Sequence, residues 1–446
     1  MKAGDHKSIY NAIVKEFEKD RIDYKKQLIG FASDGAAVMM GSEHSVKKLL
    51  RNDCPHLIVI KCTCHSLALC ASYACEKMPS YLEHLLKDIF NYLSNSPKRL
   101  SQFITIQQIV DLKPLKLLHP SATRWLSLEA VVKRVLDRYD ELTVFFGYDR
   151  NTTAQRILAH LNDEMTKPLL EFLNYILPVI NKLNRLFQSE SPEFSMIYEE
   201  MKTLRMLLLS NICNNVYLKQ LSKSDTNFER HLKAKVYVGV AATESIRKLN
   251  DENQKTFFEC CSNFYVELIK QISKRFNLND PILKAASLIN PKNLEKLKLG
   301  PLFEQFHGFY VPRDKQILEN ELRELQMKIR CQIIQIKQTD NTAVCWEKLL
   351  MVKRANQQFA FPYLRQFVSN LLTIPHSTAS VERCFSQYNL NKTKVRNRLN
   401  MDTMDGILKS KWLVSAVGGS TSMKLTRSIK TKYCKEMYDH HCNPAA

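Results

Sequence analysis

Residues 28–35 read LIGFASDG, and residues 57–61 read LIVIK. Both are short apolar runs without polar alternation, and the first ends in an Asp-Gly turn signal. Such runs are typical of parallel strands buried on both faces of a sheet. A helical pattern capped by Asp5 precedes the first run, another covers residues 39–50, and a third begins after His65. This order predicts an α/β fragment of which two strands are visible.

The rest of the chain has the spacing of helices. From about residue 77 the apolar residues recur at intervals near 3.6 for almost 300 residues, as in the stripe Leu86, Ile89, Phe90 and Leu93. A stripe at 169–180 is interrupted by Pro178, and residues 418–422 (GGSTS) break the last helical stretch. Glycine supplies only 11 of 446 residues, against a usual share of about 7%. We therefore predict a mixed α/β fold that is mostly α, without P-loop or dinucleotide-binding loops.

The composition limits the class of function. Lys and Arg number 65 against 45 Asp and Glu, so the formal net charge is +20. This excess favours polyanionic partners, nucleic acid above all. No apolar run is long enough to cross a bilayer and no signal core is present, so we expect no membrane partner. The thirteen cysteines are then expected to be reduced thiols in the cytosol or nucleus.

Two candidate sites follow the predicted strands. Asp34 stands where the carboxyl end of a parallel strand places chemistry in α/β proteins, although a plain Asp-Gly turn explains it as well. Cys62 and His65 lie in the run CTCH after the second strand. A zinc site with Cys54, Cys64, Cys70 or Cys75 is one interpretation, but the usual ligand spacings are missing. The same holds for Cys434, His440, His441 and Cys442. Buried small cysteines are the alternative.

Two further stretches combine polar and basic residues. In TRWLS at 123–127, Arg124 and Trp125 suit stacking on a base or contact with phosphate, or else a core anchor at a helix start. In PHSTASVERCFS at 375–386, Glu382 falls in the first turn of a predicted helix, where the helix dipole favours an anion. The cations that follow suit phosphate contact or a solvated face: Lys392, Lys394, Arg396 and Arg398.

Together these stretches resemble the hAT (hobo/Activator) transposase superfamily in its domesticated form. The matching segments are SDGAAVMMG at 33–41, CTCHSLAL at 62–69, TRWLS at 123–127 and PHSTASVERCFS at 375–386. Residues 361–364 and KTKVRNRL at 392–399 look like the C-terminal dimerisation region of that family. The resemblance spans almost the whole chain, and its specificity lies in the order of the four segments.

The resemblance implies a ribonuclease-H-like core interrupted by a large helical insertion. It divides the chain into a partial core at 1–76, the insertion at 77–345, a dimerisation region completing the core at 346–415, and a basic flexible tail at 416–446. The family cuts and transfers DNA strands with two metal ions held by three carboxylates. By motif position, Asp34 matches the second carboxylate and Glu382 the third. Cys62 and His65 match a structural C-x2-H motif, and Arg124 and Trp125 match a position near the DNA ends.

The first carboxylate of that set is expected to be absent. In the family it lies on the first strand of the core, whereas the pattern of the 33 residues before Asp34 predicts one helix and one strand. The earlier acids, Asp5, Asp20 and Asp23, lie at the ends of that helix. The N-terminal zinc-binding DNA finger of the family is also not found. With one carboxylate missing, binding of two Mg²⁺ ions should fail, so Asp34 and Glu382 are expected to be vestigial.

The leading hypothesis is a catalytically inactive nuclear protein with no metal or cofactor, which forms a homo-oligomer through its C-terminal region and binds DNA or protein. An active hAT transposase that uses Mg²⁺ is one alternative. A protein-interaction scaffold without a nucleic-acid role is the other.

Overall fold

The computed structural model describes residues 4–110, 112–113, 118, 128–189, 191, 194–220, 227–334, 341–394, 396–424 and 426–427. It divides into two compact units, Met1–Thr378 and Ala379–Ala446. The four-part division expected from the sequence stays a prediction.

The first unit opens with the predicted α/β fragment. Strands β1 (Gly30–Ser33) and β2 (Ile58–Lys61) pair in parallel, with Gly30 opposite Ile58 and Ser33 opposite Lys61. The two parallel strands are confirmed. The surrounding helices are α1 (His6–Lys19), α2 (Tyr24–Gln27), α3 (Ala37–Met40) and α4 (Val46–Asp53). Asp5 caps α1 as expected, because its Oδ1 accepts hydrogen bonds from the backbone N–H groups of Lys7 at 2.9 Å and Ser8 at 3.0 Å.

Two expectations about this fragment were wrong. The single helix predicted over 39–50 is broken between α3 and α4. Gly41 packs so closely that an added Cβ would lie 2.6 Å from the carbonyl oxygen of Ala37, and Ser45 starts a new helix by accepting from Lys48 N–H at 3.2 Å. The strands are also less buried than predicted, since only Ser33 and Ile58 are fully buried. A sheet of two described strands leaves each strand with one unpaired edge.

The two faces of the sheet contact different cores. A small core packs Phe31 and Val59 against α1 and α4; its buried members are Tyr24, Val46, Leu50, Cys54 and Leu57. The opposite face contributes Ile58 to a large core that continues through the helical part of the first unit as far as Ile374. The sheet is therefore the boundary between a small N-terminal layer and the main helical body.

The remaining elements of the first unit are helices, as the spacing predicts. They are α5 (Thr63–Cys75), α6 (Ser80–Ser94), α7 (Pro97–Ile109), α8 (Leu128–Leu136), α9 (Tyr139–Tyr148), α10 (Thr152–Leu161), α11 (Thr166–Phe187), α12 (Ile197–Ile212), α13 (Asn215–Gln220), α14 (Val240–Ile246), α15 (Asp251–Arg275), α16 (Pro281–Ala286), α17 (Gly300–Gln305), α18 (Lys315–Arg330), α19 (Thr342–Leu350) and α20 (Pro362–Leu372). Short 3-10 turns η2 to η7 connect several of them, among them η5 (Pro291–Lys296), η6 (His307–Phe309) and η7 (Pro312–Asp314).

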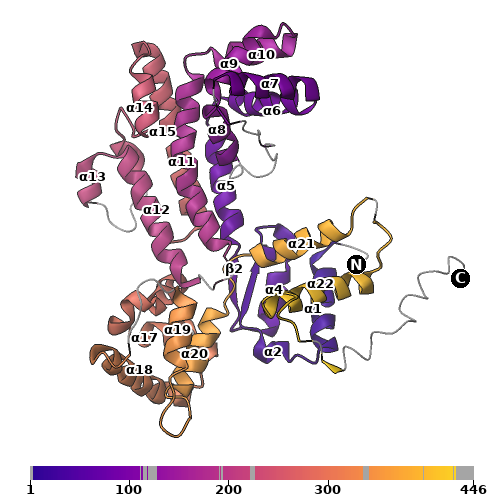
Figure 1. Cartoon of the computed structure of the whole chain (residues 1–446). Coiled ribbons are helices and arrows are strands. Elements are labelled where there is room, and N and C mark those ends of the chain that lie inside the picture. Colours follow the sequence, from indigo (N-terminus) through magenta and orange to yellow (C-terminus); the bar gives the residue numbers. More distant parts are fainter. Residues whose placement is uncertain are drawn as a thin grey trace, which may run out of the picture. The chain divides into compact units, whose positions relative to one another are not determined.

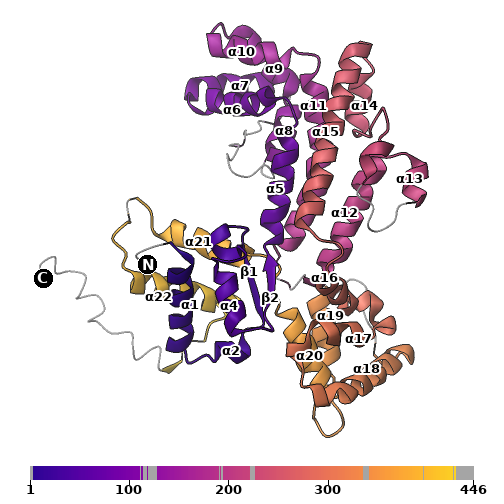
Figure 2. The same ribbon diagram turned by 180° about the vertical axis from the view of Figure 1, so that it is seen from behind.

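Helix α5 joins the sheet to the helical body. It packs against α11 and α15, and α11 packs in turn against α8 and α14 (Figure 1 and Figure 2). Pro178 does not interrupt α11, contrary to expectation, because buried side chains such as Ile176, Leu177 and Ile180 hold the helix on both sides of it. Helices α16 to α20 form a further group, which α16 joins to the other helices through its contact with α12. None of the described helices is long and apolar enough to span a bilayer.

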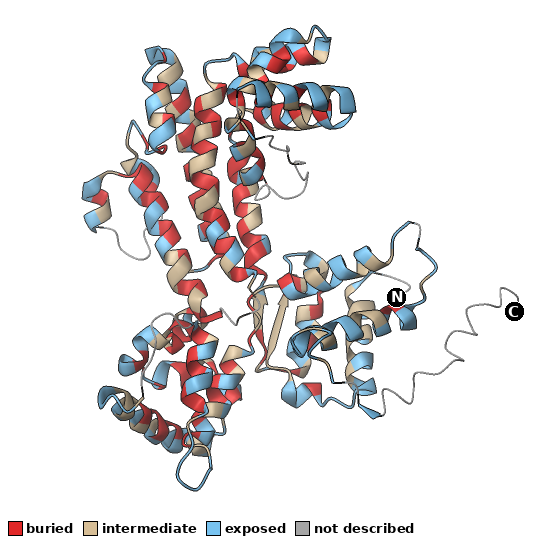
Figure 3. Ribbon diagram, viewed as in Figure 1, coloured by how far each residue is buried: buried red, intermediate tan, exposed pale blue. Residues whose placement is uncertain are grey.

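The second unit is built on two helices, α21 (Ala379–Asn391) and α22 (Met401–Ala416), which contact each other. Of the residues described in these two helices, only Ala379 and Met404 are buried, and most of the helical surface is exposed (Figure 3). Helix α22 ends before Gly418 and Gly419, whose φ angles of +84° and +112° suit glycine. This confirms the predicted break at 418–422.

Candidate functional site

Asp34 lies at the carboxyl edge of the sheet, directly after β1, and its side chain is exposed. Its Oδ1 accepts a hydrogen bond from the backbone N–H of Ala36 at 3.2 Å and one from the hydroxyl of Ser33 at 3.4 Å. A carboxylate that accepts from the N–H two residues on closes an Asx turn. Asp34 therefore has a local structural role that requires no metal ion.

Cys62 follows β2 and is 1% exposed. As the N-cap of α5, its sulfur accepts from the backbone N–H of His65 at 3.5 Å. It also accepts from the backbone N–H of Thr378 at 3.3 Å and from the Thr378 hydroxyl at 3.2 Å. Donation from the Cys64 thiol, with help from these donors, lowers the pKa of Cys62 to about 5 although burial opposes the shift. Cys62 is thus a buried sulfur on which donors from α5 and from Thr378 converge.

The other cysteine and the histidine of the CTCH run behave differently. The pKa of Cys64 is raised, first because its thiol donates to Cys62 and then because of burial. The His65 side chain is exposed, and the contact of this residue with Cys62 is made by its backbone N–H. Among the residues that the structure describes, no three His, Cys, Asp or Glu side chains come together to hold a metal ion. The three-residue spacing of Cys62 and His65 therefore brings the backbone N–H of His65 to the sulfur of Cys62, and does not bring two metal ligands together.

The segment 374–378 lies along the sheet, with Pro375 at Gly30, the start of β1, and Thr378 at Cys62, directly after the end of β2. A Cβ added at Gly30 would meet Pro375 Cδ at 2.6 Å, so the segment contacts the strand backbone closely. Thr63 donates to the carbonyl oxygen of His376 from its N–H at 3.2 Å and from its hydroxyl at 2.8 Å. The buried imidazole of His376 bonds the carbonyl oxygen of Phe187 at 3.0 Å, and burial lowers its pKa.

The polar run at 375–386 is a candidate from the sequence, but its pattern does not predict these roles. His376 and Thr378 are polar residues next to a proline, and no local signal shows that Thr378 contacts a cysteine more than 300 residues earlier.

Glu382 occupies the first turn of α21, as predicted, and is exposed. It belongs to the second unit and Asp34 to the first, so their pairing in one site stays a prediction. Arg124 and Trp125 lie outside the described residues.

The predicted cations lie mainly on the connection between α21 and α22. Lys394, Arg396 and Arg398 are exposed, and Lys392 is partly buried with its Nζ 5.8 Å from the centre of the Tyr388 ring. Within the described parts of the chain, none of the four forms an ion pair with a carboxylate. They remain available to an anionic partner.

The helices of the second unit expose several large apolar side chains. We call this set the apolar face of α21–α22, and its members are Val381, Phe385, Met401, Trp412 and Leu413. Trp412 is 73% exposed and Phe385 is 64% exposed. Exposed apolar side chains gathered on two helices that contact each other mark an interaction site in a folded protein.

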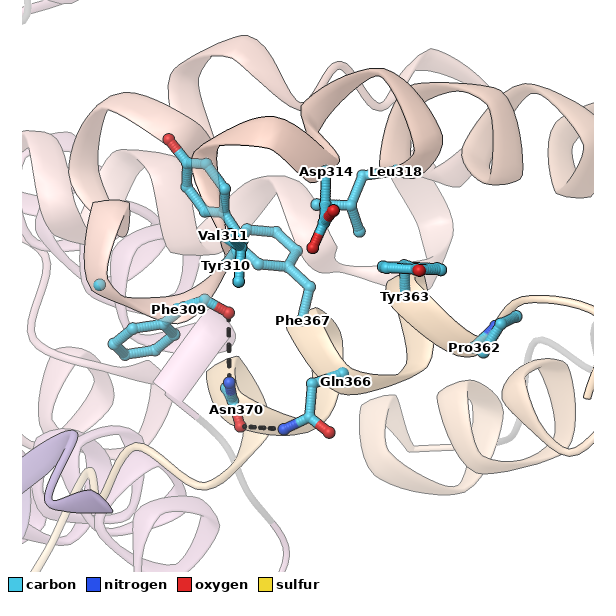
Figure 4. A pocket seen from close by; sticks show the side chains of 11 residues that line it. Phe309, Tyr310, Val311, Asp314, Leu318, Pro362, Tyr363, Gln366, Phe367 and Asn370 are labelled. Carbon is cyan, nitrogen blue, oxygen red and sulfur yellow. Dashed lines mark hydrogen bonds between the residues drawn. The ribbon is translucent and has the colours of Figure 1, made fainter. Parts of the chain in front are cut away.

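A pocket of about 720 Å³ opens in the first unit between η6, η7, α18 and α20 (Figure 4). Its aromatic wall includes Tyr310, Tyr363 and Phe367. At its polar end Asn370 donates to the carbonyl oxygen of Phe309 at 3.3 Å, and Gln366 donates to Asn370 at 3.3 Å. The residues that line this pocket carry no local sequence signal for it.

The carboxylate of Glu321, on α18, is buried close to this pocket. It caps α20 by accepting a hydrogen bond from the backbone N–H of Leu364 at 2.7 Å. The carboxylate therefore joins two of the helices that line the pocket.

Residues 324–411 match the model of the hAT family C-terminal dimerisation region. The chain carries a hAT dimerisation region. The match covers about a fifth of the chain and supports membership of the hAT family, as the resemblance predicted. No curated protein matches the chain significantly.

The hAT dimerisation region runs from within α18 to within α22. It includes α20, which forms one wall of the pocket, and most of the apolar face of α21–α22. Glu382 and the four cations at 392–398 also lie inside it, whereas Asp34, Cys62 and His65 lie outside. Most of the exposed apolar surface thus lies in a segment whose family-level role is dimerisation, and Trp412 and Leu413 follow directly after it.

Proposed function

We propose that this hAT-related chain is a domesticated, catalytically inactive nuclear protein that dimerises through its C-terminal region and binds DNA through its basic surface. The observation on which this rests is the apolar face of α21–α22, with Phe385 exposed inside the hAT dimerisation region and Trp412 exposed directly after its last residue. A second copy covering this face would bury side chains that water now surrounds. Because the same surface occurs on both copies, a two-fold dimer is the simplest arrangement.

We further propose that β1, α4 and β2 are part of a ribonuclease-H-like core. The support is the parallel strand pair with Asp34 at its carboxyl edge. A two-metal site there would need a second and third carboxylate, and the residues present do not fit one. Asp5 caps α1, Asp20 follows the end of α1, and Asp23 precedes α2, so none of these acids stands on a strand. The proposal therefore assigns no cleavage step to this chain.

DNA binding is supported by the net charge of +20 and by the exposed cations at 394–398. Neutralising phosphates with lysine and arginine releases counterions, so affinity for duplex DNA should fall steeply as salt rises. The nucleus is the compartment that holds chromosomal DNA, so the proposal places the protein there. Imaging of a fluorescent fusion in living cells tests this localisation.

Three measurements on the full chain test the proposal. Sedimentation equilibrium should show a monomer–dimer equilibrium, and a chain that stays monomeric at high concentration refutes dimerisation. A nicking and strand-transfer assay with Mg²⁺ or Mn²⁺ should show no product. Cleavage that Asp34→Ala abolishes would instead establish the active transposase. DNA affinity that stays flat as salt rises would favour the scaffold alternative.

A further inference from the structure

Four cations gather at one corner of the small N-terminal layer. Lys47, Lys48 and Arg51 lie on α4, and Lys61 is the last residue of β2. A helix that connects two parallel strands runs back against them, so the start of α4 lies at the carboxyl edge of the sheet, where β2 ends. The fold therefore brings Lys61 to the first turn of α4.

The side-chain directions agree with this placement. Val59 packs in the small core beneath α4, and Lys61, two residues further along the strand, points to the same face of the sheet. Lys47 and Arg51 are one helical turn apart and therefore neighbours on α4. Lys48, Arg51 and Lys61 are exposed, and Lys47 is partly buried.

Carboxylates do not offset this concentration of charge. None of the four cations forms an ion pair with a carboxylate anywhere in the described ranges. Lys47 Nζ donates to the carbonyl oxygen of Met40 at 3.0 Å. The pKa of Lys47 is lowered by burial and then by repulsion from Arg51, Lys61 and Lys48. Charges repel one another measurably only at short range, so this repulsion indicates that the four cations lie close together.

The arrangement also opposes the usual preference of a helix start. The first turn of a helix favours anions, yet α4 begins with Val46, Lys47 and Lys48 and has no acidic residue there. Asp53 lies at the other end of α4, and its carboxylate accepts hydrogen bonds from the hydroxyls of Tyr10 and Tyr24. Because these cations repel one another, an external anion would stabilise this corner of the fold.

We propose that Lys47, Lys48, Arg51 and Lys61 form a binding site for the phosphodiester backbone of nucleic acid. The inference rests on the proposed DNA binding and adds its location on the first unit. A nucleic acid suits this surface better than an acidic protein does. Protein interfaces have an apolar or aromatic centre, whereas no large apolar side chain is exposed between Ile22 and Tyr73. Interfaces with nucleic acid are polar and cationic, as this corner is.

The test compares two variants that each lose four positive charges. In the site variant Lys47, Lys48, Arg51 and Lys61 are changed to Gln. In the control variant four exposed lysines of α15 and of the segment around η5 are changed to Gln: Lys255, Lys274, Lys292 and Lys298. Fluorescence anisotropy with a labelled random-sequence duplex gives the dissociation constant at several salt concentrations.

We expect the site variant to bind at least ~10-fold more weakly than the control variant at moderate salt. The slope of log affinity against log salt should become shallower by ~0.9 for each phosphate that the variant no longer neutralises, so by up to about 3.6 for four cations. A third variant, with Lys47, Lys48 and Lys61 changed to Arg, keeps the charge and should keep the slope, which separates loss of charge from loss of folding.

Equal slopes for the site and control variants would overturn the proposed location while leaving DNA binding by the chain intact. A wild-type chain without salt-dependent DNA binding would refute both. If the site variant bound DNA like the control variant but no longer bound poly-L-glutamate, the corner would be a site for an acidic protein. That result would overturn the proposal. Displacement of the duplex by micromolar inorganic pyrophosphate would assign it to a free phosphate compound and also overturn it.

Discussion

Replacing Trp412 by alanine tests whether the apolar face of α21–α22 is the dimer interface. The indole is 73% exposed in the structure of one chain. A tryptophan side chain offers up to ~250 Å² for burial, so about 180 Å² is available here. At about 25 cal/mol per Å² the full area contributes about 4.5 kcal/mol, and covering half of it contributes about 2 kcal/mol.

A two-fold dimer contains this contact twice, so Trp412→Ala should weaken dimerisation by about 4 kcal/mol in total. That corresponds to a rise of about 10³-fold in the dissociation constant. Sedimentation equilibrium of the full chain over a range of concentrations measures it. Tyr148→Ala is the matched control, because Tyr148 is 82% exposed but lies on α9 and not on α21 or α22.

The control should leave the dissociation constant unchanged. The proposed interface would be refuted if Trp412→Ala dimerised as tightly as the wild type, or if Tyr148→Ala weakened dimerisation by the same factor. Circular dichroism of both variants excludes unfolding as the cause, and it should show little change because Trp412 contributes little to the core.

Three further predictions concern folding stability, measured by urea denaturation. Cys62→Ala removes the acceptor of the Thr378 and His65 donors and should cost ~1–3 kcal/mol, whereas Cys62→Ser, which keeps an acceptor, should cost less; equal losses would contradict the role of the sulfur as an acceptor. Gly30→Ala places a Cβ 2.6 Å from Pro375 Cδ and should cost ~1–3 kcal/mol, while Gly35→Ala, with open space around it, should cost much less. Burial raises the pKa of Glu321, so its contribution to stability is present below the unfolded pKa near 4.5 and is lost as pH rises through the folded value. Glu321→Gln should therefore gain stability relative to the wild type between pH 4 and 7, and a pH-independent difference would refute this.

Much of the local structure could be predicted from the sequence. The apolar runs at 28–33 and 57–61 contain the two strands, Asp5 caps the first helix, and the glycines at 418 and 419 follow the last described one. These features depend on residues within one turn or one strand, where backbone preference and apolar spacing act directly. The dimerisation region is also recognisable from its residues and agrees with the family match.

The functional surfaces are less accessible to prediction. Cys62 and His65 suggest a pair of ligands, but the structure uses the sulfur of one and the backbone of the other. The break at Gly41 is not predicted because the apolar spacing continues across it. The cation cluster at Lys47 and Lys61 is not predicted because its members are separated in the chain by a helical turn, a loop and a strand.

The order of amino acids alone determines the positions of the two strands, the start of α1 at Asp5, the excess of positive charge, and the family resemblance of the C-terminal region. Packing of the folded chain establishes that Thr378 donates to Cys62, that Glu321 caps α20, and that four cations share one corner. The difference arises from distance along the chain. Caps and periodicity act between residues a few positions apart, whereas these contacts form only when packing of the two cores brings remote segments together.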